Sequence, residues 1–244
     1  MPKTFQDAVE LCRALDIRYL WIDSLCIIQD DDADWLEHVN TMAEIDSNAF
    51  ITVAAGASDG AHGGLFKDAD PDHAKAMKVS ISSEDTTSYV YVRHRLKHLD
   101  ENIGTMGWWG VDRQMPLMTR SWVVQEHLLS RRYLTFAPNE VLWQCKVDVG
   151  CSCSAVGQSG FNELLTPQGG KENPPSFIGC RPAKGIYHRL EHGKLWEAYY
   201  EWHRMVEVYT HRKLTFPRDK LAALEGIARR YKVSVKSALP QCLC

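Results

Sequence analysis

Hydrophobic and polar residues follow two different periods in the first part of the chain. Behind Thr4, apolar side chains recur at helical spacing, which predicts an amphipathic helix over residues 5–15 with Thr4 as its N-cap. The next stretch, RYLWID (18–23), is an apolar and aromatic run that ends at Asp23, as expected for a strand buried on both faces of a parallel sheet. The pattern therefore begins with a helix and continues with a strand.

A second helix and a second strand follow in the same order. Asp34 or a neighbouring aspartate can cap a helix, and the segment AFITVAA (49–55) predicts a second buried strand. One face of this helix is apolar, with Trp35, Val39, Met42 and Ile45. The alternation of helices and strands favours an α/β sheet.

The middle of the chain predicts two strand pairs separated by an apolar helix. MKVSIS (77–82) and SYVYVR (88–93) alternate as strands do and flank a polar turn, as in a hairpin. RYLTFA (132–137) and EVLWQC (140–145) form another such pair. The segment between the two pairs, residues 121–129, predicts a short helix that is apolar almost all round.

The C-terminal part returns to helical periodicity after an irregular segment. Gly, Ser and Pro are frequent over residues 150–185, which predicts a long excursion without regular structure. One apolar stripe from Leu195 to Tyr209 and another after Pro217 predict two core helices. The predicted organisation is a core at 1–150 with an insertion at about 56–118, an excursion at 151–190, and a helical part of the same domain at 191–244.

Composition and charge limit the partners. The chain has 244 residues, 45% of them hydrophobic, which is enough for a real core. Lys and Arg number 28 against 31 Asp and Glu, and no basic block stands out, so we expect no nucleic-acid partner. We found neither a signal peptide nor a run of about 20 apolar residues, so we expect a cytoplasmic protein that does not enter a membrane.

The cysteines and histidines do not predict a metal site. Cys145, Cys151, Cys153 and Cys180 lack the spacing of two CxxC knuckles, and the ten histidines form no HExxH motif. Eight cysteines are also too few for a disulfide scaffold in a chain of this size. We expect no bound metal, and we interpret Cys26 as a buried thiol rather than a nucleophile.

Glu126 is the main candidate for chemistry because it is a carboxylate inside an apolar helix. Helical spacing places it on one face with Trp122, so its surroundings are expected to be partly apolar. Partial desolvation raises the pKa of a carboxyl group, and such groups concentrate at active sites. A structural salt bridge to Arg120, Arg131 or Arg132 explains the carboxylate equally well.

Asp23 is the second candidate. It ends a predicted parallel strand, and ligands of open α/β sheets bind beyond the carboxyl ends of the strands. The alternative is that Asp23 only caps the turn that follows it. The neighbouring acidic residues Asp30, Asp31 and Asp32 are expected to form a solvated helix start.

Several blocks of sequence, in one order from residue 3 to about 228, resemble the HET (heterokaryon incompatibility) domain of filamentous fungi. The blocks are TFQDAVELCRALDIRYLWIDSLCIIQDD, MAEIDSNAFITVAAGAS, GGLF, RSWVVQEHLLSRRYLTF with LWQC, and YTHRKLTFPRDKLAALEGIA. The resemblance implies a module of self/non-self recognition whose activation triggers programmed cell death. It also implies partners that are other cell-death signalling proteins or further copies of the chain.

The HET family has been proposed to be distantly related to TIR domains. This relationship implies a TIR-like (flavodoxin-like) fold: a doubly wound, mostly parallel sheet, here with a β-hairpin insertion and C-terminal helices. Some TIR domains cleave NAD at the nicotinamide–ribose bond, and plant-type members carry a Trp and, four residues on, the catalytic Glu. Trp122 and Glu126 are similar in residue and spacing. The resemblance therefore implies Glu126 as the catalytic residue and NAD as a substrate, with no bound cofactor. We expect Asp23, Trp122 and Gln125 to bind the substrate.

The resemblance leaves alternatives open. HET domains usually begin with a strand of the pattern YxxLSYxWG, and this sequence starts after it, so one alternative is an inactive, N-terminally truncated chain. A second is a non-enzymatic interaction or oligomerisation module with Glu126 in a structural ion pair. A third, less favoured, is a HET-like scaffold used for small-molecule chemistry.

Overall fold

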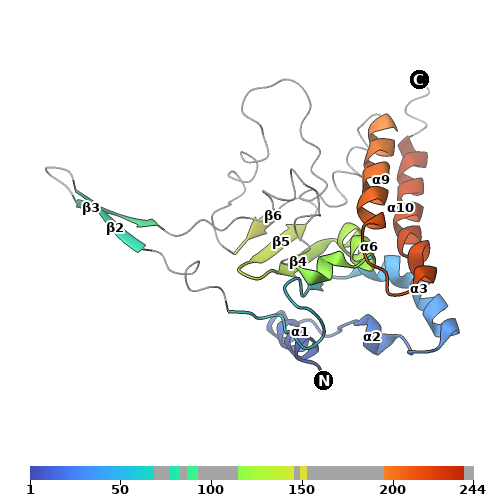
Figure 1. Cartoon of the computed structure of the whole chain (residues 1–244), viewed down its shortest axis with the longest axis horizontal. Helices are drawn as coiled ribbons and strands as arrows, with labels where there is room; N and C mark the ends of the chain where they lie inside the picture. Colours follow the sequence, from blue (N-terminus) through green and yellow to red (C-terminus); the bar gives the residue numbers. More distant parts are fainter. Residues whose placement is uncertain (69–76, 83–86, 93–114, 146–148, 153–194, 239–244) are drawn as a thin grey trace.

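The computed structural model describes residues 1–68, 77–82, 87–92, 115–145, 149–152 and 195–238. In this part of the chain, helices and strands combine around a small mixed sheet, so the expected α/β character is confirmed. Figure 1 shows one short helix, α6, between the sheet and a pair of long C-terminal helices.

The first helix, α1 (Lys3–Ala14), forms where the apolar spacing predicts it, but Thr4 is not its N-cap. Pro2 precedes the helix, and Thr4 lies within its first turn. The Thr4 hydroxyl instead contacts a distant loop: it accepts a hydrogen bond from the Gly64 amide at 3.0 Å and lies 3.3 Å from the Gly60 carbonyl oxygen. The predicted cap is therefore wrong because the hydroxyl makes tertiary contacts.

The predicted strand at 18–23 is also wrong. Residues 18–22 contain no strand, and Asp23 begins a single-turn helix, α2 (Asp23–Cys26). Tyr19 is 85% exposed, and the Cys26 thiol expected to be buried is exposed as well. Within the described residues nothing pairs with 18–22, and a strand without a neighbour leaves its backbone groups to water.

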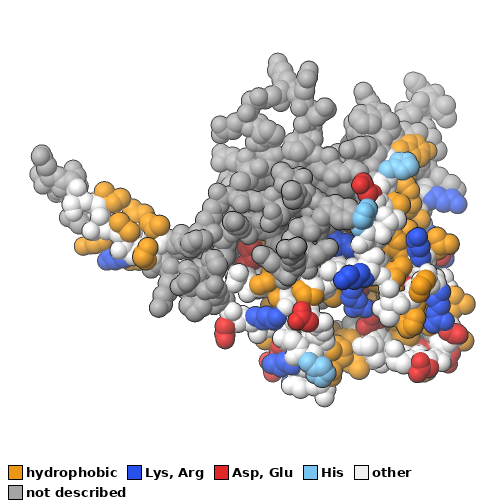
Figure 2. Space-filling model, viewed as in Figure 1, with side chains coloured by type: hydrophobic (Ala, Val, Ile, Leu, Met, Phe, Trp, Pro, Cys, Tyr) orange, Lys and Arg blue, Asp and Glu red, His pale blue; other side chains and the backbone are white. Residues whose placement is uncertain are grey.

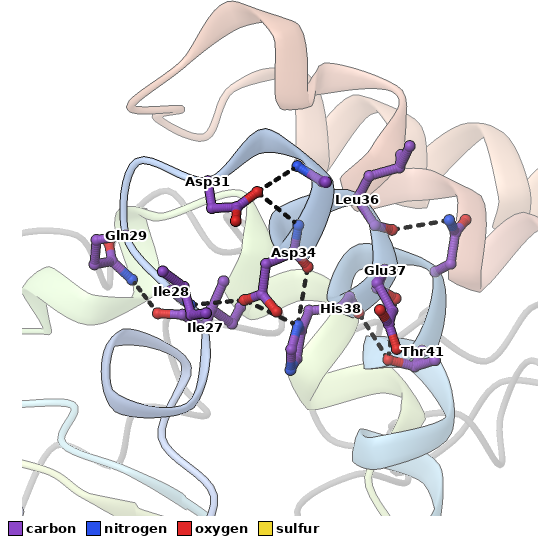
Figure 3. A network of polar contacts seen from close by, with 11 residues as sticks. Ile27, Ile28, Gln29, Asp31, Asp34, Leu36, Glu37, His38 and Thr41 are labelled. Carbon is purple, nitrogen blue, oxygen red and sulfur yellow. Dashed lines mark hydrogen bonds and ion pairs between the residues drawn. The ribbon is translucent and has the colours of Figure 1, made fainter.

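The helix α3 (Asp32–Asn48) begins at the aspartate cluster, as predicted (Figure 3). Asp31 is the N-cap, and its Oδ1 accepts hydrogen bonds from the amides of Ala33 and Asp34 at 2.9 and 3.1 Å. The Asp34 carboxylate in turn accepts from the Ile28 amide at 2.7 Å and lies 3.5 Å from Nδ1 of His38. These contacts fix the start of α3 against the preceding loop.

The main sheet contains β1 (Thr52–Ala54), β4 (Arg132–Phe136), β5 (Val141–Cys145) and β6 (Val149–Cys151), in the order β1-β4-β5-β6. Only β1 and β4 run parallel, with Val53 opposite Leu134. The β4–β5 and β5–β6 pairs are antiparallel. The tight turn after β4, in which Ala137 donates to the Glu140 carbonyl at 2.9 Å, permits only an antiparallel return. Among the described strands the mostly parallel sheet expected above is therefore not found.

The second sheet is the predicted hairpin of β2 (Met77–Ser82) and β3 (Thr87–Val92). Figures 1 and 2 show it standing away from the rest of the described chain, with apolar side chains on its surface. Directly opposed residues lie on the same face of a hairpin, so the register groups one exposed aliphatic set: Met77, Val79, Ile81, Val90 and Val92.

Helix α6 (Trp122–Leu129) lies between two hydrophobic clusters. Toward the sheet, Val123 packs with residues that include Ala54 and Tyr133. On its other side, Val124 and Leu128 pack against the C-terminal helices α9 (Leu195–Thr210) and α10 (Ala222–Ala238). Two 3₁₀ helices, η2 (Pro116–Thr119) and η3 (Pro217–Lys220), precede α6 and α10. A helix covered on both sides is apolar all round, which explains its composition.

No helix in the described part of the chain combines the length and the apolar character needed to cross a membrane.

Candidate functional site

Glu126 lies in the middle of α6, where most side chains are buried. Many protein atoms surround its carboxyl group, yet part of the side chain remains in contact with solvent. Within the described residues its carboxylate forms neither a hydrogen bond nor an ion pair. It is therefore a carboxyl group held in a largely apolar environment and still open to solvent on one side.

A second carboxyl group, that of Asp46, approaches Glu126 from the last turns of α3. Asp46 is 6% exposed, and its side chain accepts a hydrogen bond from the Gln125 side-chain amide. Its other oxygen, Oδ2, has no hydrogen-bond partner among the described residues. The two carboxyl groups are close enough for their charges to repel each other.

Tyr133 of β4 adds a third polar group to this cluster. The side chain is 2% exposed, and its hydroxyl has no hydrogen-bond partner among the described residues. Its phenol interacts electrostatically with both Glu126 and Asp46. We name Asp46, Glu126 and Tyr133 the acidic cluster.

The physical environment favours protonated acids in the acidic cluster. Burial, and after it the repulsion from Asp46, raises the pKa of Glu126 to about 8, although the Arg120 charge opposes this shift. Burial raises the pKa of Asp46 to about 7, and the hydrogen bond from Gln125 offsets part of the effect. Burial also raises the pKa of the Tyr133 phenol well above its usual value. Near neutral pH the two carboxyl groups therefore hold protons that exposed acids would have lost.

The predicted salt bridges to Glu126 are not found among the described residues. Arg131 donates to the Asn48 side chain at 3.4 Å, and Arg132 donates to the Phe50 carbonyl at 3.1 Å. Arg120 is exposed and near enough to lower the pKa of Glu126, but it forms no ion pair with that carboxylate. The alternative that Glu126 only forms a structural salt bridge is therefore not supported for any of these three arginines.

The other predicted site residues lie around the acidic cluster in different ways. Asp23 is exposed at the start of α2, accepts a hydrogen bond from the Ser24 amide at 2.7 Å, and is close enough to affect the charge of Glu126. The Trp122 indole nitrogen lies 3.4 Å from Oδ2 of Asp219, toward the C-terminal helices. The structure thus brings Asp23 toward Glu126 and directs the hydrogen-bonding edge of Trp122 elsewhere.

Gln125 is 2% exposed and lies where α3, α6 and α10 meet. A Cβ atom at Gly226 would come within 2.4 Å of the Gln125 Oε1 atom and 2.6 Å of the Ala43 Cβ atom. Only glycine at position 226 leaves room for the Gln125 side chain. This packing holds the amide against Asp46, so Gln125 supports the cluster from behind.

His127, the next residue of α6, is a buried neutral group outside the acidic cluster. Its Nε2 lies 2.5 Å from Oε1 of Gln144, and its ring meets the Tyr133 ring edge to face with centroids 4.7 Å apart. Burial lowers the pKa of His127 to about 4. His127 therefore helps to orient Tyr133 without adding a positive charge near Glu126.

Sequence reasoning missed Asp46 and Tyr133. A signal for Asp46 exists in the sequence, because it continues the helical spacing of Trp35, Val39 and Met42 and so falls on the apolar face of α3. For Tyr133 no comparable signal exists, since an aromatic residue in a strand is expected in any core.

The described residues contain no group of three acidic, histidine or cysteine side chains that could hold a metal ion. Of the four cysteines considered for zinc, Cys145 is a free, half-buried thiol. Cys153 and Cys180 lie outside the described residues.

Comparison with known families places the chain beside one whose members share its first half. The family model described as heterokaryon incompatibility protein (HET) matches residues 1–126, which is more than half of the 244 residues. The matched segment ends at Glu126 and includes Asp23, Asp46, Trp122 and Gln125. Neither the curated proteins nor the solved structures gave a significant match.

Proposed function

Because the chain belongs to the heterokaryon incompatibility (HET) family, we propose that it acts in fungal self/non-self recognition and triggers programmed cell death by cleaving NAD at Glu126. In this proposal the family is distantly related to TIR domains and uses a related chemistry. The acidic cluster is the reaction site, and NAD is the substrate. Other cell-death signalling proteins act upstream or downstream of the reaction in the cytoplasm.

The observation that supports this proposal is the Glu126 carboxyl group itself. It lies among many protein atoms, has no ion-pair partner among the described residues, and keeps contact with solvent. A carboxyl group that only stabilises a fold is expected to have donors around it, because an unpaired buried polar group costs about 1–3 kcal/mol. A carboxylate left without donors is suited to stabilise a positive charge on a ligand.

The reaction generates such a charge. The bond between ribose C1′ and the nicotinamide ring nitrogen breaks, and both electrons leave with the nitrogen, so the cationic ring departs as neutral nicotinamide. The positive charge passes to C1′ and the ribose ring oxygen, where the Glu126 carboxylate stabilises it. Water then adds to C1′ and releases one proton. One NAD and one water thus yield nicotinamide, ADP-ribose and one proton.

Residues around Glu126 fit the remaining charges of NAD. Arg120 is exposed, and its charge acts on Glu126, so it is suited to meet the negative pyrophosphate. Asp23, also exposed and near Glu126, can accept hydrogen bonds from ribose hydroxyls. In this proposal Trp122 and Gln125, from the same helix as Glu126, complete the surroundings of the substrate.

The experiment compares three proteins incubated with NAD, with nicotinamide measured by chromatography. We expect wild-type chain to release nicotinamide and Glu126→Gln to lose the release by about 100-fold or more, because the neutral amide cannot stabilise the cation. Glu44→Gln is the matched control: it removes one carboxylate from an exposed position on α3 and leaves release unchanged. Equal release by wild-type and Glu126→Gln proteins would remove Glu126 from the reaction.

The exposed hairpin favours a second candidate function, a non-enzymatic module that signals by self-association. Its aliphatic face is 42–67% exposed at Met77, Val79, Ile81, Val90 and Val92. An isolated two-stranded hairpin is marginally stable in water, so a second copy covering this face would stabilise it. We expect the apparent mass in size-exclusion chromatography to rise with concentration in that case.

A pair of variants separates the two faces of the hairpin. Val79→Glu places a charge at the centre of the aliphatic face and should keep the chain monomeric. Ser80→Glu places the same charge on the opposite face, beside Tyr89, and should leave association unchanged. A wild-type chain that stays monomeric at every concentration would contradict this second candidate.

A further inference from the structure

The connection between α9 and α10, residues 211–221, fixes the start of α6. The Lys213 amide donates a hydrogen bond to the Thr119 carbonyl at 2.7 Å, and the Lys213 carbonyl accepts one from the Ser121 amide at 3.0 Å. Arg120, between these two residues, forms a parallel β-bridge with Lys213. The backbone that enters α6 is therefore attached to a segment beyond the residues that the HET family model matches.

Asp219 of η3 adds a side-chain contact to this attachment. Asp219 is 5% exposed, and its Oδ2 accepts a hydrogen bond from the Trp122 indole nitrogen at 3.4 Å. The backbone beside Asp219 is fixed from α9, because the hydroxyl of the buried Tyr209 side chain donates to the Lys220 carbonyl at 2.6 Å. The Asp219 carboxylate is therefore an acceptor in a fixed position for the indole of α6.

The neighbouring Arg218 does not neutralise this carboxylate at close range. Its Nη1 lies 2.9 Å from Oδ1 of Asp32 at the start of α3, and its guanidinium carbon lies 5.3 Å from the centre of the Trp35 ring. Its Nε is 3.9 Å from Oδ1 of Asp219, too far for a hydrogen bond, and that oxygen has no hydrogen-bond partner among the described residues. In this part of the chain, the Trp122 indole is thus the one hydrogen-bond donor to the Asp219 carboxylate.

We propose that Asp219 is a positioning residue for Trp122: it fixes the indole ring beside the substrate on which Glu126 acts. Trp122 is half-buried, so its ring borders both the C-terminal helices and the solvent. The hydrogen bond to Asp219 anchors the edge of the ring that carries the nitrogen and leaves the rest for contact with a ligand. Without this bond the ring can turn to other rotamers. This role rests on the proposed function, in which Trp122 contributes to the surroundings of the substrate.

The contact is tested without substrate, by NMR of the full chain labelled with ¹⁵N-tryptophan. The indole N–H signal of Trp122 is the one that disappears in Trp122→Phe. In Asp219→Ala this N–H loses its acceptor, so we expect its proton signal to move upfield and to exchange faster with water. Asp219→Asn retains an acceptor oxygen and should keep the wild-type signal. Glu225→Gln, which removes an exposed carboxylate from α10, is the matched control and should leave the signal unchanged.

The kinetics of nicotinamide release from NAD test the positioning role. Asp219→Ala and Trp122→Phe should each raise KM about fivefold and leave kcat within about twofold, because each removes one hydrogen bond that orients the surroundings of the substrate. The double variant should raise KM no further than either single variant, since both changes remove the same contact. Asp219→Asn should keep the wild-type KM.

Asp219→Leu, similar in volume and unable to accept a hydrogen bond, replaces Asp219→Ala if that variant does not fold. An unchanged Trp122 signal in the folded variant, or KM increases that multiply in the double variant, would overturn the positioning role. A fall in kcat at unchanged KM would also overturn it and assign Asp219 to the fold alone. Absence of nicotinamide release by the wild-type chain would refute the proposed function and the substrate role with it, whereas the indole signals would still decide the contact between Asp219 and Trp122.

Discussion

Two buried acidic sites in this chain are constructed in opposite ways. Asp7 of α1 is fully buried and is surrounded by donors: the Lys3 ammonium group contacts one oxygen, and the Leu65 amide donates to the other at 2.8 Å. Asp46 is buried and Glu126 is half-buried, and the one donor to either of them among the described residues is the Gln125 amide. The Lys3 hydrogen bond lowers the pKa of Asp7, whereas burial raises those of Asp46 and Glu126.

The comparison teaches that the donors, and not burial alone, decide what a buried carboxylate does. Asp7 joins α1 to the loop around Leu65, and its oxygens are satisfied, which is the arrangement of a structural residue. The carboxyl groups of the acidic cluster lack such hydrogen-bond donors, so they keep their protons to a higher pH. A site of this kind reduces stability at neutral pH, and carboxyl groups with raised pKa values concentrate at functional sites.

The largest expected effect on stability comes from removing the satisfied carboxylate. Asp7→Ala leaves the buried Leu65 amide without an acceptor, so we expect the free energy of unfolding to fall by about 2–3 kcal/mol. Denaturant titration followed by circular dichroism measures the change. Lys3→Ala, which removes only the exposed partner, should cost less. If Asp7→Ala unfolds at the same denaturant concentration as the wild-type chain, the Asp7 carboxylate does not stabilise the fold.

The pH dependence of stability should separate the two sites by sign. The stabilisation from Asp7, whose folded pKa is lowered, is present above its unfolded pKa and is lost as pH falls through the folded value. Asp46 and Glu126 act in the opposite direction: unfolded, they release protons near pH 4, whereas folded they keep them until about 7 and 8. The free energy of unfolding should therefore fall steadily between pH 5 and 8, the window that separates the unfolded from the folded pKa values of the two groups.

Variants assign this loss to the acidic cluster. Asp46→Asn and Glu126→Gln should each flatten the decline between pH 5 and 8, and Glu44→Gln should not change it. Unfolding curves at four pH values are sufficient to see the difference. A wild-type free energy of unfolding that rises steadily over this range would contradict the unpaired state of the two carboxyl groups.

The smallest of these effects concerns the loop that supports Asp7. Gly64 has a φ of +78°, and a Cβ atom there would lie 2.9 Å from Oδ2 of Asp7. Gly64→Ala should lower the free energy of unfolding by about 1–2 kcal/mol because a side chain is strained in this conformation. Gly60→Ala is the matched control, since a Cβ atom at Gly60 meets nothing within 4 Å. Equal stability of the two variants would show that the loop yields without disturbing Asp7.

Local patterns were sufficient for much of the fold. The strand pair around the 137–140 turn and the buried helix α6 follow from the order of apolar residues, because each is determined by contacts close in sequence. The stretch 18–22 is equally apolar, yet it forms no strand, since pairing depends on a neighbour that a local pattern cannot reveal. Thr4 fails as a predicted cap for a similar reason, because its partner is the loop near residue 60.

The candidate site was predictable only in part. Glu126 is recognisable as an acid in an apolar helix, whereas Asp23, expected at the end of a strand, lies at the start of a helix and acts electrostatically on Glu126. Asp46 comes from a helix 80 positions earlier, and no spacing rule connects the two residues. The packing of α3 against α6 brings the charge of Asp46 to bear on Glu126, so only the structure reveals this second carboxyl group.

The most direct test of the account is the pH profile of nicotinamide release from NAD, measured between pH 6 and pH 9 for wild-type and Glu126→Gln proteins. We predict that release by the wild-type chain rises as Glu126 loses its proton, with a midpoint near the pKa of about 8, and that Glu126→Gln stays near background throughout. Absence of NAD cleavage by folded wild-type protein at every pH, or the same profile in the variant, would contradict it.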